Sequence, residues 1–286
     1  MGDEELLKSI KLKLSHIESN LSDDEISSMA LEFVKTNKMF IVNRFLQKYN
    51  NSREAIFLAG SAGAGKSEFA TSLSNFKPIS IIDTDEIRKL FSNYNGANSY
   101  LFQKASSKGV DILYNEAMKK GISFVLDGNF SNKEMQRRNI KRALDNGFNV
   151  SLHFIYRPLD VAKTYTKLRE LKEGRKVPDE IFFNKFVGAI ETTQAIVEEF
   201  SLQEHFSFYD IENEVIYRKN EALEQFINTT KQDYKIAQYK LSNHIDSNDS
   251  SALESIEQNG LSLTDSDSKA DNVSDDHNRN INKRRM

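Results

Sequence analysis

Residues 60–67 of this chain, Gly-Ser-Ala-Gly-Ala-Gly-Lys-Ser, constrain its fold more than any other segment. They follow an apolar run, Ala55–Ala59, and precede a stretch compatible with a helix, which is the order of a phosphate-binding P-loop. Glycines let successive backbone N–H groups point at a phosphate, and the N-terminus of the helix adds partial positive charge. The segment therefore predicts a nucleotide site between a strand and a helix.

The motif gives its residues separate tasks. Lys66 is expected to reach the β- and γ-phosphates of a nucleotide, and Ser67 to bind Mg²⁺. ATP and Mg²⁺ are thus the expected cofactors. The alternative is a glycine-rich turn with a surface lysine. The backbone cradle would be formed by Gly60, Gly63, Ala64 and Gly65, together with Lys66 and Ser67.

Five apolar runs alternate with helical stretches along the chain. They are rich in Ile, Val, Phe and Leu and lack the polar alternation of half-solvated strands, which is typical of strands buried on both faces. Strict alternation of strand and helix predicts an α/β fold with a parallel sheet covered by helices. We predict a kinase-type P-loop sheet of about five strands, at Ala55–Ala59, Ile79–Asp83, Ile122–Asp127, Val150–Tyr156 and Phe206–Ile211.

Helix-start signals lie between these runs. Ser131-Asn-Lys-Glu134 fits a capping box, and Asn146-Gly147 marks the end of that helix. Pro178-Asp179 predicts the start of a later helix.

The chain divides into three parts by composition. Residues 1–50 are predicted to form a helical extension, in which Ser22-Asp-Asp-Glu25 is a second capping box. Residues 51–242 hold the P-loop kinase domain. Residues 243–286 contain no aromatic residue and are dominated by Ser, Asn and Asp, so we expect a disordered tail that buries too little apolar surface to fold.

Composition excludes several classes of protein. The absence of cysteine excludes a disulfide framework, a thiolate metal site and a cysteine nucleophile. No run approaches about 18 apolar residues and the start of the chain is acidic, so we expect no membrane span, no secretory signal and a cytoplasmic location. The net charge of −3 provides no overall attraction for nucleic acid, so we expect no nucleic-acid partner.

Acidic residues follow two of the predicted strands, at the sheet edge where α/β proteins bind ligands. Asp83-Thr-Asp85 ends the second strand, and Asp85 could orient and deprotonate an acceptor hydroxyl. The alternative is that Thr84 caps a helix. Asp127 ends the third strand before Gly128-Asn129. It is expected near the metal and the phosphates, unless it only forms a strand-end turn.

Two arginines lie on a helical segment and the loop after it, Arg169 and Arg175. Guanidinium groups on such a lid could close over the triphosphate and neutralise the charge that develops during transfer. Solvated surface arginines are the alternative.

Taken together, the Gly-x-x-x-x-Gly-Lys-Ser loop, the Ile-Asp-x-Asp element with a following Arg, the apolar-acid-Gly element and the spaced lid arginines resemble the zeta-toxin P-loop kinases over about residues 55–215. The resemblance implies an enzyme that phosphorylates the amino sugar of UDP-N-acetylglucosamine with ATP and Mg²⁺. It implies catalytic roles for Lys66, Asp85, Arg169 and Arg175, metal binding by Ser67 and Asp127, and substrate contacts from Asp111, Asp127 and Asn129.

The sequence departs from that family pattern where the acceptor is recognised. Asp127-Gly-Asn129 stands where the family has Glu-Gly-Thr, Phe130-Ser-Asn132 replaces an expected Arg, and Ser92-Asn-Tyr94 replaces an expected His-Pro. The phosphate chemistry is thus better supported than the identity of the acceptor. Alternatives are a P-loop kinase acting on a nucleoside, a polynucleotide end or another metabolite, and a regulatory protein that binds ATP without catalysis.

The resemblance also implies a possible protein partner. Zeta toxins are inhibited by a helical antitoxin over the nucleotide site. Residues 1–50 are expected to pack on the main body, and the alternative is that they supply such inhibition within the chain. A chain of residues 51–286 should then be more toxic to a host than the full chain.

Overall fold

The computed structural model describes residues 21–47 and 52–243. The predicted disordered tail, apart from Asn243, lies outside the described residues, as do residues 1–20 of the predicted helical extension.

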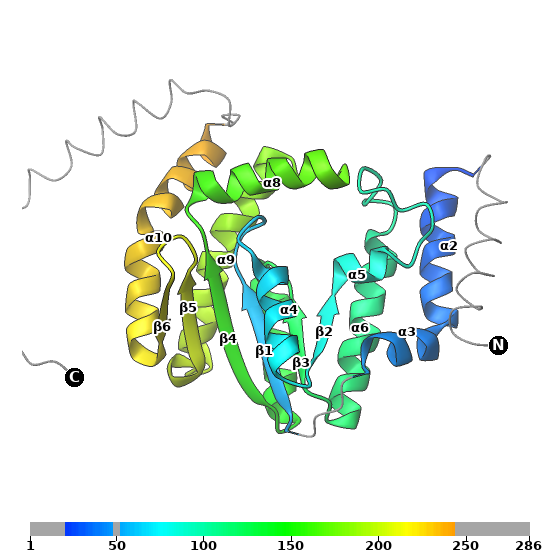
Figure 1. Cartoon of the computed structure of the whole chain (residues 1–286), viewed down its shortest axis with the longest axis horizontal. Coiled ribbons are helices and arrows are strands. Elements are labelled where there is room, and N and C mark those ends of the chain that lie inside the picture. Colours follow the sequence, from blue (N-terminus) through cyan, green and yellow to red (C-terminus); the bar gives the residue numbers. More distant parts are fainter. Residues whose placement is uncertain (1–20, 48–51, 244–286) are drawn as a thin grey trace, which may run out of the picture. The chain divides into compact units, whose positions relative to one another are not determined.

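A six-stranded sheet forms the centre of the fold (Figure 1). Its strand order is β2-β3-β1-β4-β5-β6, and all neighbours are parallel except β5 and β6. The strands are β1 (Glu54–Ala59), β2 (Ser80–Asp83), β3 (Phe124–Asp127), β4 (Asn149–Tyr156), β5 (Phe206–Asp210) and β6 (Val215–Arg218).

The α/β prediction is confirmed, and five strands lie where the apolar runs predicted them, within two residues at each end. The sixth strand, β6, was missed. It has four residues, and only Tyr217 among them is even partly buried. Such an exposed edge strand lacks the continuous apolar run that identifies the buried ones. It pairs antiparallel with β5 after a tight turn, with Asp210 opposite Val215.

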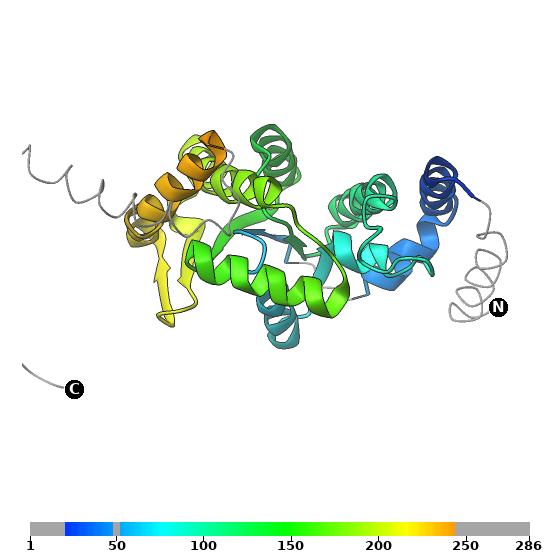
Figure 2. The ribbon, with the colours of Figure 1, turned by 90° about the horizontal axis from the view of Figure 1, so that it is seen from above.

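Helices cover both faces of the sheet, and the view from above in Figure 2 places α4 opposite α6, α7 and α9. Successive side chains of β1 point to opposite faces of the sheet. Ala55 and Phe57 belong to the large core, whereas Ile56 and Leu58 belong to the smaller core under α4. The helices are α2 (Asp23–Thr36), α3 (Lys38–Phe45), α4 (Lys66–Phe76), α5 (Thr84–Arg88), α6 (Gln103–Lys120), α7 (Lys133–Asp145), α8 (Leu159–Glu173), α9 (Asp179–Glu199), the 3₁₀ turn η2 (Gln203–His205) and α10 (Lys219–Ser242).

The helix-start predictions can be checked against hydrogen bonds. The capping box of α2 is confirmed, because the Glu25 N–H donates to the Ser22 hydroxyl and the Ser22 N–H donates to the Glu25 carboxylate at 2.8 Å. The predicted box at residue 131 is wrong by one residue. Asn132 caps α7 by accepting from the Met135 N–H at 2.9 Å, because the Ser131 hydroxyl donates instead to the Asn129 side chain.

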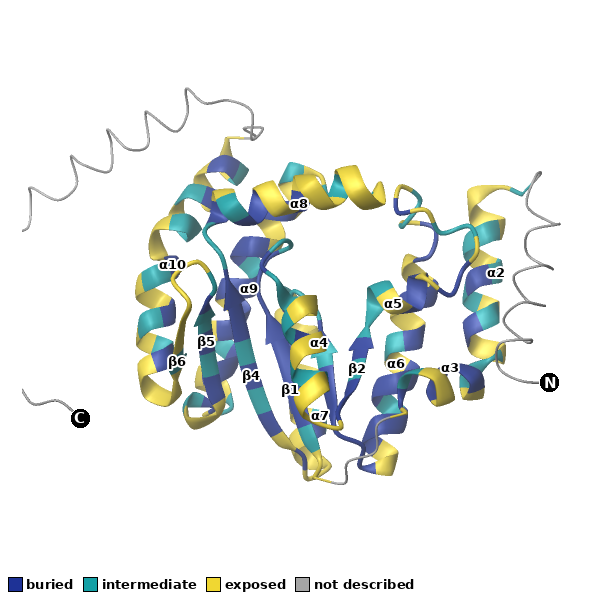
Figure 3. Cartoon of the chain, viewed as in Figure 1, coloured by how far each residue is buried: buried dark blue, intermediate teal, exposed yellow. Residues whose placement is uncertain are grey.

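The two N-terminal helices pack on the outer side of α6. Their apolar residues, including Val34 and Ile41, join the large core, as the buried stripes on α2 and α3 show in Figure 3. Lys38 adds an ion pair with Glu116 of α6 at 2.7 Å. Among the described residues, no helix is both long and apolar enough to cross a membrane.

Candidate active site

A cavity of about 470 Å³ lies at the carboxyl edge of the parallel strands, where the loops of α/β sheets bind ligands. Its volume is in the range of small-molecule sites. The walls come from the P-loop, the ends of β2 and β3, the far half of α8 and the segment after it. Residues predicted for the site that line it are Gly63, Lys66, Ser67, Asp85, Asp127, Asn129, Arg169 and Arg175.

The P-loop backbone has room for glycine alone at two positions. Gly60 has φ +133°, and a Cβ there would lie 2.2 Å from the carbonyl oxygen of Ile155. Gly63 has φ +77°, and its Cβ would lie 2.1 Å from the carbonyl oxygen of Ala162. These contacts hold the loop against the end of β4 and the start of α8. The loop therefore curls over the N-terminus of α4, which begins at Lys66.

Lys66 lies across the mouth of this loop. Its ammonium donates to the carbonyl oxygens of Gly60 at 3.0 Å and Ser61 at 2.6 Å. Burial lowers the pKa of Lys66, and the nearby carboxylate of Asp127 opposes that shift. The ammonium thus lies in a partly desolvated position beside the cavity, where the low local dielectric constant strengthens its attraction to a phosphate.

Ser67 and Asp127 form a pair of oxygen donors next to Lys66. The Ser67 hydroxyl donates to the Asp127 carboxylate at 2.7 Å. Burial raises the pKa of Asp127, although Lys66 and the Ser67 hydroxyl favour its ionised form. One hydroxyl and one carboxylate suit Mg²⁺, which takes few protein ligands and completes its shell with water and phosphate oxygens. In residues 21–47 and 52–243, no cluster of three or more His, Cys, Asp or Glu offers a fuller metal site.

Three arginines converge on Asp85. Its carboxylate accepts short bonds from Arg88 and Arg175 and a longer one, 3.3 Å, from Arg169. Burial disfavours the charged form of Asp85, but the guanidinium groups of Arg175, Arg88 and Arg169 outweigh it and hold its pKa below the usual range. The two lid arginines predicted from the sequence are thus brought to Asp85 from 84 and 90 residues away.

Arg88 has a larger role than the sequence assigned to it. It is 3% exposed, and its guanidinium joins Asp85 to Gln103 at the start of α6. The signal was the i, i+3 spacing of Asp85 and Arg88, which places the two side chains together on a helix. The alternative role of Thr84 as a helix cap is wrong, because Asp83 caps α5 by accepting from the Asp85 N–H at 2.8 Å.

Two predicted substrate residues have different surroundings. Asn129 lines the cavity, but its side-chain oxygen accepts from the backbone and hydroxyl of Ser131 at 3.2 and 2.8 Å. Asp111 is exposed on α6 and is not among the residues that line the cavity. It lies eight residues after Gln103, about 12 Å farther along the helix. The structure does not bring Asp111 to the site.

Asp83 is a site residue to which the sequence gave no separate role. Burial, together with the negative charges of Asp127 and Asp85, raises its pKa to about 7. The contribution of Asp127, second to that of burial, is visible in the strand register, which places Asp83 opposite Asp127. The sequence shows both acids, but not that parallel pairing puts them side by side.

Replacing Asp83 with asparagine should make stability less dependent on pH. A carboxyl that keeps its proton up to about pH 7 when folded, but loses it near pH 4 when unfolded, costs stability as pH rises through that window. Asparagine keeps the helix cap without the charge. We expect Asp83→Asn to gain about 1–2 kcal/mol over the wild type between pH 4.5 and pH 8. Urea unfolding of both proteins at pH 4.5 and pH 8 measures this gain. If the variant and the wild type differed in free energy of unfolding by the same amount at both pH values, the raised pKa of Asp83 would be contradicted.

The chain is similar to a known protein family and to solved structures. A family model described as Zeta toxin matches residues 42–222. The solved structure of the PezAT chromosomal toxin–antitoxin system of Streptococcus pneumoniae is similar with a TM-score of 0.53 and 16% identity, over 79% of this chain and 98% of that chain. The AvrRxo1-ORF1:-ORF2 complex is similar with a TM-score of 0.52 and 16% identity, over 65% of each chain. At such identities the two structures show the fold alone. No curated protein matches the chain.

Proposed function

Because the chain belongs to the zeta-toxin family, we propose that it is an ATP-dependent kinase that transfers the γ-phosphoryl group to a sugar hydroxyl of UDP-N-acetylglucosamine or a similar acceptor. One observation carries this proposal. Lys66, Asp85 and the two lid arginines, which come from three separate segments, all line one cavity. Nucleotide binding needs the P-loop, whereas phosphoryl transfer also needs a carboxylate that can accept the proton of the acceptor hydroxyl.

In the proposed mechanism, the P-loop backbone and Lys66 hold the phosphates of ATP. Ser67 and Asp127 would hold Mg²⁺, which supplies charge neutralisation at the phosphate oxygens. Arg169 and Arg175 would bind the γ-phosphoryl group and stabilise the charge that develops on it. Both already point into the cavity through their ion pairs with Asp85.

Asp85 is proposed as the base that accepts the proton of the acceptor hydroxyl. Its three guanidinium partners make it a weak base, because they stabilise its charged form. We propose that Arg169 and Arg175 exchange the carboxylate for phosphate oxygens when ATP binds, which raises the pKa of Asp85 again. Arg88 would remain with Asp85, since its other end is bound to Gln103. The lid arginines would thus link phosphate binding to activation of the base.

The cavity lining also bears on the chemical identity of the acceptor. It includes neutral polar residues, Ser99, Gln103 and Asn129, whose hydroxyl and amide groups suit those of a sugar. A nucleoside, a polynucleotide end or another metabolite is the second candidate, favoured by the short Asp127-Gly-Asn129 element where the family has Glu-Gly-Thr.

An acceptor panel tests the function. The purified chain would be incubated with Mg²⁺-ATP and separate UDP-sugars, nucleosides and oligonucleotides, and mass spectrometry would report any added phosphate. We expect phosphorylation of UDP-N-acetylglucosamine or a close analogue. Phosphate on a nucleoside or oligonucleotide alone would favour the second candidate. Binding of ATP with transfer to no acceptor would indicate a regulatory protein.

The family also suggests toxicity and a protein partner. Of the two structures named above, one is described as a toxin–antitoxin system and the other as a complex of two chains. We propose that expression of this chain arrests growth of a bacterial host and that an antitoxin-like protein counters it. Growth should continue when the Lys66→Ala variant is expressed, because the arrest depends on phosphoryl transfer.

A further inference from the structure

The loop between α5 and α6 contacts the lid backbone through a glycine. Gly96 lies in this loop with φ +84°, and a Cβ there would lie 2.0 Å from the carbonyl oxygen of Glu173 and 3.1 Å from the backbone nitrogen of Arg175. From the other side, a Cβ on Gly174 would lie 3.1 Å from the carbonyl oxygen of Asn95. Figure 1 shows the end of α8 beside this loop. The two backbones therefore meet at a distance that admits no side chain at Gly96.

This contact lies at the segment that carries the lid arginines. Arg175 follows Gly174 directly, and Arg169 is one helical turn before Glu173, to which its Nε donates at 2.9 Å. Both guanidinium groups reach Asp85. A shift of the 173–175 backbone would therefore move both arginines with respect to the cavity.

The loop itself is held in shape by two asparagines. Asn95 and Asn98 exchange bonds, each side-chain oxygen accepting from the other's backbone N–H at 3.2 and 3.0 Å. The Asn98 amide also donates to the carbonyl oxygen of Asn93 at 2.7 Å. Hydrogen bonds within the loop thus fix the backbone near Gly96, where it contacts residues 173–175.

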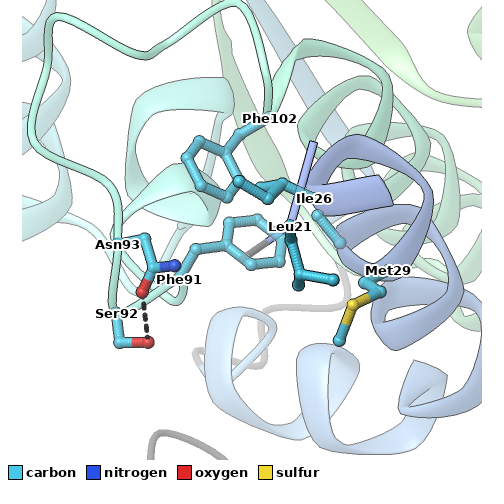
Figure 4. Close-up of a pocket in the computed structure, with 8 residues that line it drawn as sticks. Leu21, Ile26, Met29, Phe91, Ser92, Asn93 and Phe102 are labelled. Atoms are coloured by element: carbon cyan, nitrogen blue, oxygen red, sulfur yellow. Dashed lines mark hydrogen bonds between the residues drawn. The ribbon is translucent and has the colours of Figure 1, made fainter. Parts of the chain in front are cut away.

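Helix α2 anchors the base of the same loop. Phe91 and Phe102, at the two ends of the loop, stack with ring centroids 4.9 Å apart. Figure 4 shows Ile26 and Met29 of α2 beside these rings, where they line a small apolar pocket. The Tyr100 hydroxyl adds a bond to the Asp23 carboxylate of α2 at 2.7 Å.

We infer that Gly96 is a positioning residue: the loop of residues 89–102, anchored on α2, docks on the end of α8 and fixes the segment from which Arg169 and Arg175 reach the cavity. The catalytic consequence rests on the proposed kinase function, whereas the docking itself does not. No described residue of α2 or α3 lines the cavity. Helix α2 therefore acts on the arginine clamp through the loop that it anchors, and its described residues do not cover the cavity.

The full-length Gly96→Ala variant tests the inference, with Gly147→Ala as its matched control. Gly147 has φ +72° and no atom within 4 Å of a Cβ, so its replacement brings the same backbone strain without the clash. In hydrogen–deuterium exchange, we expect the hydrogen-bonded amides of residues 172–174, at the end of α8, to exchange ~10-fold or more faster in Gly96→Ala than in the wild type. Gly147→Ala should leave those amides unchanged. Equal exchange in all three proteins overturns the inference.

Kinetics on the acceptor identified in the panel give the second readout. Gly96→Ala should lower kcat by about 10-fold or more through misplaced arginines, with a smaller change in KM for ATP, whose cradle is the P-loop. Gly147→Ala should match the wild type. Unchanged kcat with faster exchange would refute the catalytic role of the contact.

A second, milder variant tests the same inference if Gly96→Ala does not fold. Asn98→Ala removes the two bonds that this side chain makes, with the Asn95 N–H and the Asn93 carbonyl oxygen, and adds no clash. It should therefore also speed exchange at residues 172–174, by a smaller factor. Protection there equal to that of the wild type overturns the inference. If the wild type phosphorylates no acceptor, the proposed function fails, and the exchange results still decide whether the loop docks the lid.

Discussion

Replacing Lys66 with alanine should lower the rate of phosphoryl transfer by about 10³-fold or more, since one positioned charge at developing negative charge contributes on this scale. Its ammonium is held at the loop mouth by two backbone carbonyl oxygens, and burial strengthens its interaction with phosphate. Stability should not fall much, because the partial desolvation that lowers the pKa of this half-buried ammonium costs free energy in the folded state. Initial rates and thermal unfolding measure the two effects.

The control for this variant is Lys77→Ala, at the other end of α4. Lys77 is exposed and pairs with Glu54 at 3.3 Å, outside the cavity lining. Its replacement should leave the rate within about twofold, as an exposed ion pair contributes little. A Lys66→Ala enzyme with the rate of the Lys77→Ala control would refute the role of the P-loop in transfer.

Replacing Asp85 with asparagine should lower the rate by about 10²- to 10⁴-fold, the usual contribution of a positioned general base. The amide cannot accept a proton from the acceptor hydroxyl, and it also loses the charge that the arginines neutralise. Asparagine retains one oxygen for Arg88, which is 3% exposed, so the protein should remain folded with stability lowered by about 1–3 kcal/mol. Transfer rates and urea unfolding check both expectations.

Glu86→Gln is the matched control for Asp85. Glu86 is the next residue on α5, and its exposed side chain pairs with Lys89. The same loss of one negative charge there should change neither rate nor stability noticeably. If Asp85→Asn transferred phosphate as fast as Glu86→Gln, Asp85 would not be the base, and Asp83 would be the next carboxylate to test.

The local elements of the fold could be predicted because their signals are contiguous in the sequence. The P-loop is one run of eight residues, and the buried strands are continuous apolar runs. The capping box at Ser22 needs only Glu25, three residues later. Strand β6 could not be predicted in this way, because its side chains are mostly exposed and form no continuous apolar run. Its pairing with β5, which the sequence pattern does not show, makes it a strand.

The contacts between distant segments could not be predicted. Asp85 was identified as an acid at a strand end, but its bonds to Arg169 and Arg175 depend on how α8 crosses the sheet edge. The raised pKa of Asp83 depends on the register that sets it beside Asp127. Gly96 carries no motif, and its importance appears only once Glu173 lies against it. Asp111 shows the converse, since a position taken from a family pattern proved to be exposed and outside the cavity.

Calorimetric titration of the full chain with Mg²⁺-ATP tests the central claim most directly, namely that the loop of residues 60–67 binds a nucleoside triphosphate. We predict saturable one-to-one binding by the wild type, reduced by about 10²-fold or more in Lys66→Ala, because a buried charge pair is lost, and unchanged in Lys77→Ala. No binding to the wild type, or equal affinity in Lys66→Ala, would contradict the account.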